Sequence, residues 1–397
     1  MTFIRFKRSL AVFVWAALLA GTGLPAHSQT VGQTAGQPAA AAPVAVGSPA
    51  ELTLALRNPR ARSIALAPGD YGDVTLGHLG RAMRIAAADP ATPPVFSSLT
   101  ISGAEDLTLA DIAVKLSVPP EKKYQSMVNI DHVSRLTLTG MTFDGAAAPA
   151  ARELRGLLLQ NSSDITISDC RFTGFFRALV GLAVRDVMLT HNDISGMSSD
   201  GFNFAQAQNV TIARNRFGAF KTTEASHADY VQFWSTGTEK ASRNITVAEN
   251  LMLQGEGVDV QGIFLEFEPR LPARDVTVRD NVIIQSSPHG ISLYNVIGAT
   301  VEGNMAVAIP QAKYKVAIRL IGVSDGRVTD NVATAYGYDS IRNVTRQNNS
   351  EVGFADKPGL ARIGEAVAAF LDGRPLPPLL RIRLPEAIRA AGVRPHR

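Results

Sequence analysis

The chain has 397 residues, of which 46% are hydrophobic and 19% are charged, and its formal net charge is +4. Three positive residues, Arg5, Lys7 and Arg8, lie near the N-terminus; subtracting them from +4 leaves +1, and no basic cluster with interleaved aromatic residues indicates nucleic-acid binding. The single cysteine, Cys170, excludes an intramolecular disulfide and is predicted to be a buried core thiol.

Residues 1–28 have the pattern of a signal peptide. The basic residues precede an apolar stretch from Leu10 that is too short to span a bilayer, and Ala26 and Ser28 put small residues at the cleavage positions. We expect cleavage before Gln29 and a periplasmic or secreted protein. The alternative is an uncleaved anchor. No second apolar run of spanning length follows in the sequence.

The segment after the cleavage site changes character at Ser48. Residues 29–47 are rich in Ala, Gly, Pro, Gln and Val and carry no charge, which predicts a flexible linker. Ser48 to Glu51 then fit a capping box with Pro at the first helical position, so a short helix is expected from Pro49 to Arg57. Such a helix would cap the open end of a repeat structure.

A repeated phrase follows, in which two apolar residues alternate with a polar one and Asn comes three positions after the second apolar residue. The clearest copies are Val187–Asn192, Val210–Asn215, Ile245–Asn250 and Val276–Asn281. Successive Asn residues from Asn192 to Asn331 are 23, 35, 31, 23 and 27 positions apart, which fits stacked coils with insertions. We expect these Asn residues at a tight bend, in left-handed conformations and stacked into an amide ladder.

The segment from Ser63 to Leu76 alternates around a Pro-Gly turn and resembles the "LxPGxY" opening segment of pectate-lyase-like proteins. The phrases DITISDCRF, NVTIARNRF and NITVAEN resemble the right-handed parallel β-helix repeat family across about Leu66 to Asn349. The resemblance implies an all-β, single-stranded right-handed parallel β-helix of the polysaccharide lyase, epimerase and hydrolase group. Leucine-rich repeats need a denser Leu lattice, and a β-sandwich would not repeat one phrase.

The length suggests two domains, but the repeats predict one. Residues 48–350 are assigned to the β-helix and residues 351–397 to a C-terminal cap and tail. Within the cap, residues from Ile363 to Leu371 are expected to be helical.

A second strand precedes each phrase, and its outward positions mix aromatic, amide and charged residues. Period-two alternation gives these outward residues: Asn203, Tyr230, Gln232, Trp234, Phe264, Glu266, Ser292, Tyr294 and Arg319. Coils about 4.8 Å apart would bring them to one groove, walled by the loops 220–228 and 253–259.

This groove is predicted to bind an acidic polysaccharide. The candidate catalytic residues are His227, Tyr230, His289, Tyr294 and Arg319. The candidate substrate-binding residues are Asn203, Lys221, Gln232, Trp234 and Glu266, with Trp234 stacking on a sugar ring.

The leading hypothesis is β-elimination, or the related C5 epimerisation, on a uronate glycan. His227 would be the base, Tyr230 or Tyr294 the acid, and Arg319, with Lys221 and the amides, would stabilise the enediolate. The Asp-Pro-His signature of mannuronan epimerases is absent, and His227-Ala-Asp229 matches it only loosely.

Two alternatives stay open. The segments at Ser199–Phe202, Asp229, His289–Ser292 and Arg319 resemble those of polygalacturonase-type hydrolases, but one of the family's paired acids falls on Ala228. An inverting hydrolase would then rely on Asp200 and Asp229 as its two carboxylates. The third hypothesis is a carbohydrate-binding or adhesin β-helix, which needs no base.

No cofactor is assigned with certainty. A calcium-assisted lyase is one option, because Asp200 and Asp229, with Glu224 and Glu266, offer hard oxygen ligands. We expect a monomer that binds an acidic polysaccharide, with no nucleic-acid partner and no membrane span after signal cleavage.

Overall fold

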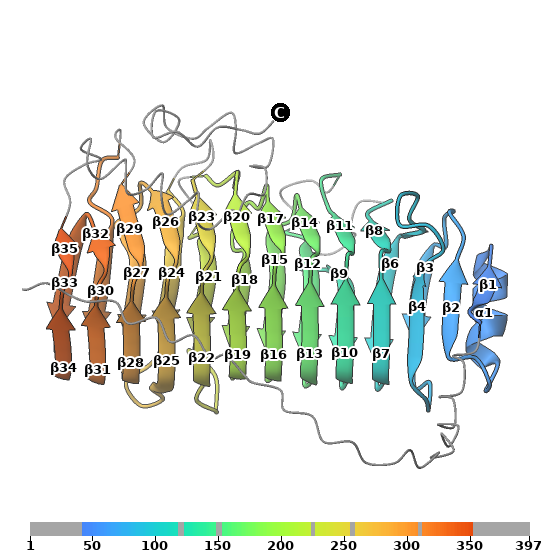
Figure 1. The fold of residues 1–397 in the computed structure, drawn as a ribbon, viewed down its shortest axis with the longest axis horizontal. Coiled ribbons are helices and arrows are strands. Elements are labelled where there is room, and N and C mark those ends of the chain that lie inside the picture. The colour runs from blue at the N-terminus through green and yellow to red at the C-terminus, as the bar shows by residue number, and fades with distance from the viewer. Residues whose placement is uncertain are drawn as a thin grey trace, which may run out of the picture. The chain divides into compact units, whose positions relative to one another are not determined.

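The computed structural model describes residues 42–117, 123–147, 153–223, 227–254, 259–308 and 312–351. The expected signal peptide, residues 29–41 of the expected linker and the helix expected from Ile363 to Leu371 lie outside these residues. Within them the chain winds into stacked coils whose strands form three parallel sheets (Figure 1).

From β4 (Met83–Ala87) to β33 (Ala335–Asp339), each coil contributes one strand to each of the three sheets, called A, B and C. In the described residues, sheet A contains β1 (Val44–Val46), β2 (Ser63–Leu66), β4 (Met83–Ala87), β7 (Glu105–Ala110), β10 (Ser134–Thr139), β13 (Ser163–Ser168), β16 (Arg185–Thr190), β19 (Gln208–Ala213), β22 (Arg243–Ala248), β25 (Ala273–Arg279), β28 (Val296–Glu302), β31 (Ser324–Thr329) and β34 (Arg342–Gln347). Sheet B contains β5 (Val95–Phe96), β8 (Ala113–Lys115), β11 (Thr142–Asp144), β14 (Arg171–Thr173), β17 (Asp193–Ser195), β20 (Arg216–Gly218), β23 (Leu251–Leu253), β26 (Val282–Gln285), β29 (Met305–Ala308), β32 (Val332–Ala333) and β35 (Ser350–Glu351). Sheet C contains β3 (Asp73–Leu76), β6 (Ser98–Ser102), β9 (Ser126–Asp131), β12 (Arg155–Gln160), β15 (Arg177–Leu182), β18 (Phe202–Ala205), β21 (Asp229–Trp234), β24 (Gln261–Glu266), β27 (His289–Tyr294), β30 (Ala317–Ile321) and β33 (Ala335–Asp339).

The N-terminal end of the stack carries the helix α1 (Pro49–Arg57), as the sequence predicts. The Ser48 side chain accepts a hydrogen bond from the Glu51 N–H, and Leu52 is buried. Strand β1 precedes this helix and pairs in parallel with β2. The linker boundary expected at residue 47 is therefore wrong, because Val44–Val46 already belongs to the sheet.

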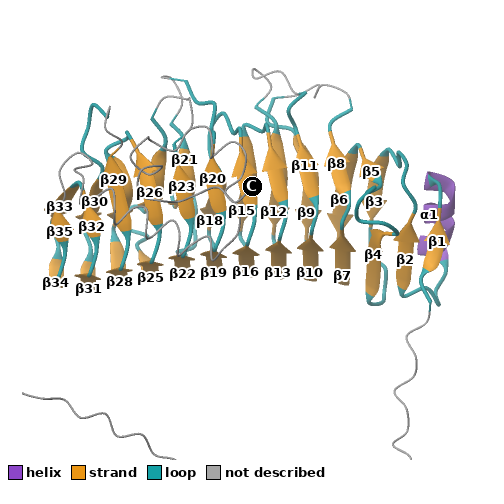
Figure 2. Ribbon diagram, turned by 45° about the horizontal axis from the view of Figure 1, so that its top comes forward, coloured by secondary structure: helices purple, strands orange, loops and turns teal. Residues whose placement is uncertain are grey.

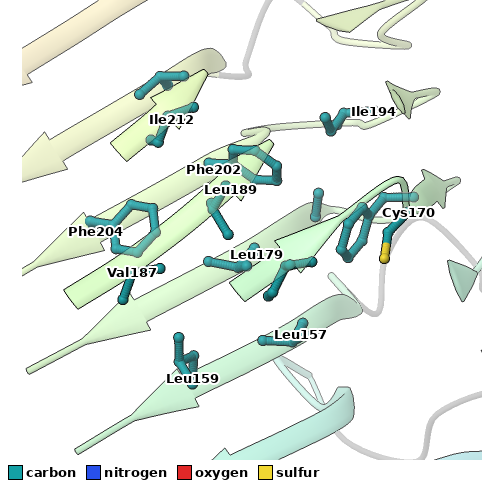
Figure 3. Packing of buried hydrophobic residues seen from close by; sticks show 14 of the residues in the cluster. Leu157, Leu159, Cys170, Leu179, Val187, Leu189, Ile194, Phe202, Phe204 and Ile212 are labelled. Carbon is teal, nitrogen blue, oxygen red and sulfur yellow. The ribbon is translucent and has the colours of Figure 1, made fainter. Parts of the chain in front are cut away.

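The core lies between the sheets and is filled by both apolar residues of each alternating pair. Figure 3 shows Leu157, Leu179 and Phe202 of sheet C close to Val187 and Leu189 of sheet A. All five are at most 2% exposed. Burying each such side chain contributes about 1.5–3 kcal/mol. The strands that carry these residues stack through many coils (Figure 2). Cys170 is 1% exposed and burial raises the pKa of its thiol to about 12, as expected of a core cysteine.

A ladder of asparagine amides marks the bend between sheets A and B. Asn215 Nδ2 donates to Asn250 Oδ1 at 3.0 Å, and Asn250 Nδ2 donates to Asn281 Oδ1 at 2.9 Å. The expected amide ladder is thus confirmed. The expected left-handed conformation is not: it falls on the preceding residue, such as Arg214 (φ 57°) and Glu249 (φ 55°). The Asn side chain points inward instead and satisfies buried backbone groups of neighbouring coils.

The all-β, parallel β-helix predicted from the repeats is confirmed by this architecture. Among the described residues, no helix is long and apolar enough to cross a membrane.

Candidate functional site on the outer face of sheet C

The strand register of sheet C aligns the predicted outward residues in two columns. The middle column, one residue per coil, is Asn203, Gln232, Phe264, Ser292 and Arg319. The outer column beside it is Trp234, Glu266 and Tyr294. The alternating partners, such as Val231 and Phe233, are fully buried, so the predicted row is brought together.

A third column, which we call the edge column, lies at the start of the same strands. It consists of Arg155, Arg177, Asp200, Asp229, Gln261 and His289, one per coil. In most of these coils the next residue is Gly or Ala, because it turns inward against the neighbouring backbone. At Gly201 an added Cβ would collide with the Tyr230 carbonyl oxygen, and at Gly262 with that of Gly290.

Tyr230 occupies this inward corner position and does not face the groove. Its side chain is 0% exposed, and its ring packs 4.9 Å from Phe220 and 5.9 Å from Phe217, centroid to centroid. Its hydroxyl makes no hydrogen bond among the described residues, and burial raises its pKa. The prediction that Tyr230 is an outward catalytic acid is therefore wrong. Period-two alternation fails at the corner, where two consecutive residues turn inward.

Asp200 lies at the centre of a buried polar network. Arg177 Nε lies 2.7 Å from its Oδ2, and Asn203 Nδ2 donates to the same oxygen at 3.0 Å. Its Oδ1 accepts the Ser199 hydroxyl at 3.2 Å and the Asp229 N–H at 3.1 Å. Asp200 is 1% exposed. Arg177 and the hydrogen-bond donors therefore balance its negative charge within the protein, and the carboxylate is not accessible to a ligand.

His227 and Asp229 form a pair at the rim of the same coil. His227 Nδ1 lies 3.3 Å from Asp229 Oδ2, and His227 Nε2 lies 3.2 Å from Gln261 Nε2. The His227 side chain is 59% exposed, whereas that of Asp229 is 0% exposed. Asp229 raises the pKa of His227, and burial raises the pKa of Asp229 itself.

Phe264 separates the two histidines. Its ring centroid lies 5.5 Å from that of His227 and 5.3 Å from that of His289, both edge-on, and 5.5 Å from that of Tyr294. This nearly buried ring fixes the spacing of three polar groups that project outward.

His289 differs electrostatically from His227. Its Nδ1 lies 3.0 Å from Ser292 Oγ. Burial, followed by the positive charges of Arg319 and His227, lowers the pKa of His289 to about 4. Arg319 also favours the phenolate of Tyr294, although burial dominates and raises the pKa of that hydroxyl. The geometry thus places a neutral imidazole, a guanidinium and a phenol in two adjacent coils.

The amide and indole groups of the predicted binding residues bond to one another. Trp234 Nε1 donates to Asn203 Oδ1 at 2.6 Å, and Asn203 Nδ2 also donates to Gln232 Oε1. Both Trp234 and Gln232 are half-buried, so the indole is held at a set angle on the surface. Glu266 is exposed beside Trp234 in the outer column.

Lys221 is not part of a strand of sheet C. It follows β20 of sheet B, it is exposed, and its backbone N–H donates to Met197 O. Among the described residues its side chain forms no ion pair, and no register pair joins it to sheet C. Glu224, in the expected loop, lies outside the described residues.

The candidate metal ligands do not fit a calcium site. Asp200 already has Arg177 and three hydrogen-bond donors around its oxygens, and Asp229 is fully buried against His227. Calcium requires six to eight accessible oxygen ligands. Within the described ranges, no group of three or more His, Cys, Asp or Glu residues could hold a metal ion.

Arg177, Gln261 and Arg155 are the groups that the sequence analysis missed. The available signal was the Gly or Ala after each edge residue: Arg-Ala, Asp-Gly, Gln-Gly and His-Gly recur at the same point of the coil.

One protein-family model matches part of the chain. Residues 126–306 match the family model described as "Right handed beta helix region". This region is a right-handed β-helix. The predicted resemblance is therefore confirmed for the repeats that carry the edge column from Arg155 to His289. No curated protein matches the sequence.

Three solved structures show how varied the similar folds are. PfbA, a surface adhesin of Streptococcus pneumoniae, is 10% identical, with a TM-score of 0.45 over 76% of this chain and 88% of that chain. The catalytic domain of a GH87 alpha-1,3-glucanase is 13% identical, with a TM-score of 0.39 over 82% and 68%. The periplasmic alginate epimerase AlgG is 10% identical, with a TM-score of 0.35 over 71% and 77%. At these values the likenesses carry no argument about activity.

Proposed function

We propose that the protein is an exported polysaccharide lyase or C5-epimerase that acts on a uronic-acid-containing glycan bound along the outer face of sheet C. The observation that carries this proposal is the neutral His289 beside Arg319 and Tyr294. Proton abstraction next to a carboxylate needs a base, a cation at the developing enediolate and, for elimination, an acid. These three side chains supply that set.

The reaction assigns one step to each residue. Nδ1 of His289 is hydrogen-bonded to Ser292 Oγ, which leaves Nε2 to take the proton at C5 of the uronate. The electron pair of the broken C–H bond moves into the carboxylate, and Arg319 stabilises the resulting dianion. In elimination the pair returns to form the C4–C5 double bond as the C4–O bond breaks, and Tyr294 protonates the departing oxygen. In epimerisation a proton is instead returned to C5 from the opposite face.

The remaining outer-face groups are assigned to binding. Trp234, held by Asn203, offers a ring face for a sugar, and Gln232 offers an amide to its hydroxyls. His227 replaces His289 as base in a second version of the same chemistry, which the sequence analysis favoured. The exposed His227 imidazole lies at the rim, whereas His289 lies nearer Arg319.

The hydrolase alternative is less well supported. Asp200 and Asp229 are at most 1% exposed, and their oxygens face Arg177, Asn203 and His227. An inverting hydrolase needs both carboxyl groups to reach the glycosidic bond or a water molecule. A binding or adhesin role needs neither base nor acid and remains the competing outcome of the activity test.

The test is incubation of the purified protein with a panel of uronate polysaccharides. A rise in the ultraviolet absorbance of unsaturated uronate indicates elimination, whereas new reducing ends without it indicate hydrolysis. NMR of the polymer detects epimerisation, which produces neither signal. Binding without any of the three signals would overturn the enzyme proposal in favour of an adhesin.

The key variants are His289→Ala and Arg319→Ala. Each is expected to abolish turnover with little change in the melting temperature, because both lie on the outer face. Full activity in either variant would remove that residue from the mechanism, and His227→Ala tests the alternative base in the same assay.

A further inference from the structure

Two arginines of the edge column lie side by side, and among the described residues only one of them forms an ion pair with a carboxylate. Arg155 of β12 and Arg177 of β15 are register partners in adjacent coils. Arg177 is paired with Asp200 at 2.7 Å. Among the described residues Arg155 forms no ion pair, and its buried Nε has no hydrogen-bond acceptor. Burial and then the charge of Arg177 lower the pKa of Arg155, and the nearby Tyr124 and Glu153 offset this only in part, so an anion in contact with the guanidinium would relieve both costs.

An exposed aromatic ring lies directly beside this unpaired cation. Tyr124 is 45% exposed, and the Arg155 guanidinium carbon lies 5.5 Å from its ring centroid. Lys123 Nζ lies 4.9 Å from the same centroid but is already paired with Glu153 at 2.8 Å. Phe176 supports the Tyr124 ring edge-on at 6.5 Å. Arg155 is therefore the cation of this cluster that lacks a carboxylate partner.

We propose that Arg155 and Tyr124 form a second glycan-binding subsite, in which Arg155 pairs with a uronate carboxylate and the Tyr124 ring packs against the sugar. This inference rests on the proposed function, since it takes the bound polymer to be a uronate glycan. Arg177 contributes positive potential next to the subsite but keeps its bond to Asp200. The ligand class is an anionic pyranose unit, because a guanidinium that has no ion pair among the described residues and lies next to a ring face matches a carboxylate on a sugar.

The position of the subsite predicts a dependence on chain length. In the order of sheet C, five strand steps separate β12, which carries Arg155, from β27, which carries His289. At about 4.8 Å per step, the two lie about 24 Å apart along the coil axis. One polymer lying along the sheet would reach both, whereas a short oligosaccharide would reach only one.

The experiment compares Arg155→Gln and Tyr124→Ala with the control Arg185→Gln. Arg185 is an exposed arginine of sheet A, paired with Asp186, on another face of the coil. Binding of uronate oligosaccharides of increasing length is measured by calorimetry, with a neutral glycan of matched length as a second arm. Both subsite variants are expected to weaken binding of the long oligomers about tenfold or more, and the control to have no effect. Affinity for the shortest oligomers at the His289 end is expected to stay unchanged.

Equal affinities of the wild type and both subsite variants for long oligomers would overturn the inference. Equal weakening for short oligomers or for the neutral glycan would also overturn it. Melting temperatures identify a folding defect in Arg155→Gln, in which case Tyr124→Ala, a change at an exposed side chain, decides the outcome. If the protein turns over a uronate glycan but neither Arg155→Gln nor Tyr124→Ala weakens binding, only the subsite is refuted. If both variants weaken binding of long oligomers but the protein shows no turnover, only the proposed chemistry is refuted.

Discussion

His227 Nδ1 lies 3.3 Å from Oδ2 of Asp229, a carboxylate that is entirely withdrawn from solvent while the imidazole remains 59% exposed. A buried carboxyl group thus acts on an imidazole at the surface. The first prediction is that Asp229→Asn lowers the pKa of His227, because the hydrogen bond with the Asp229 side chain is the largest cause of its elevation and the charge of Asp229 adds to it.

This shift is measured by following the imidazole resonances of His227 by NMR across pH. Asp193→Asn serves as the control, because Asp193 lies on sheet B and pairs with Arg216. An unchanged pKa of His227 in Asp229→Asn would show that the pair does not interact electrostatically.

The second prediction uses pH to distinguish the two histidines as the base. His289 has a pKa of about 4, so it stays unprotonated well below neutrality, whereas the pKa of His227 is raised above 6.5. If His289 is the base, kcat stays constant as the pH falls until it approaches 4. An acid limb above pH 6.5 that disappears in Asp229→Asn would assign the base to His227 instead.

The same depressed pKa has a consequence for stability. Below pH 6.5 the unfolded chain takes up a proton at His289 that the folded protein resists until about pH 4. The free energy of unfolding therefore loses a contribution as the pH falls through this window. His289→Gln removes that dependence, which urea unfolding at several pH values would detect.

The third prediction compares two tyrosines. Tyr294→Phe is expected to lower the rate of elimination by about 10²- to 10⁴-fold, as for loss of a general acid. Tyr230→Phe is expected to leave the rate unchanged and to stabilise the fold by about 1–2 kcal/mol, because it removes a buried hydroxyl that has no hydrogen-bond partner among the described residues. Rates and thermal unfolding of the two variants check both statements, and a large loss of activity in Tyr230→Phe would contradict the inward placement.

The fourth prediction concerns the amide ladder. Asn250→Ala leaves the backbone and side-chain N–H groups of Asn215 without their shared acceptor inside the core. We expect a loss of about 2–4 kcal/mol in the free energy of unfolding. Gln208→Ala, which removes the acceptor of two exposed hydrogen bonds from Arg243, is the control and should cost much less. Equal costs would show that the ladder contributes no special stability.

The fold was predictable because its information repeats along the chain. Phrases such as Ile245–Asn250 occur once per coil. Each phrase indicates the two apolar residues that point into the core and the Asn that joins the amide ladder. The outward columns followed from the same alternation, which correctly placed Asn203, Gln232 and Arg319 in one column.

The rest of the site could not be predicted from the two-residue alternation of inward and outward side chains. Tyr230 breaks the alternation because the chain turns a corner there, and only the Gly residues at the same position of other coils signal that turn. Arg177 and Asp200 are 23 positions apart, and their pairing depends on side-chain rotamers across coils. The difference in charge state between His227 and His289 arises from burial and from Asp229 and Arg319, not from any local motif.

The coil spacing of the edge column has a consequence for the proposed glycan binding. Arg155 and His289 are joined by whole coils, so each inserted or deleted coil would move one along the axis without changing the chemistry of either. The number of coils, rather than any single side chain, would then set how many sugar units lie between the unit bound at the proposed Arg155 subsite and the unit at His289.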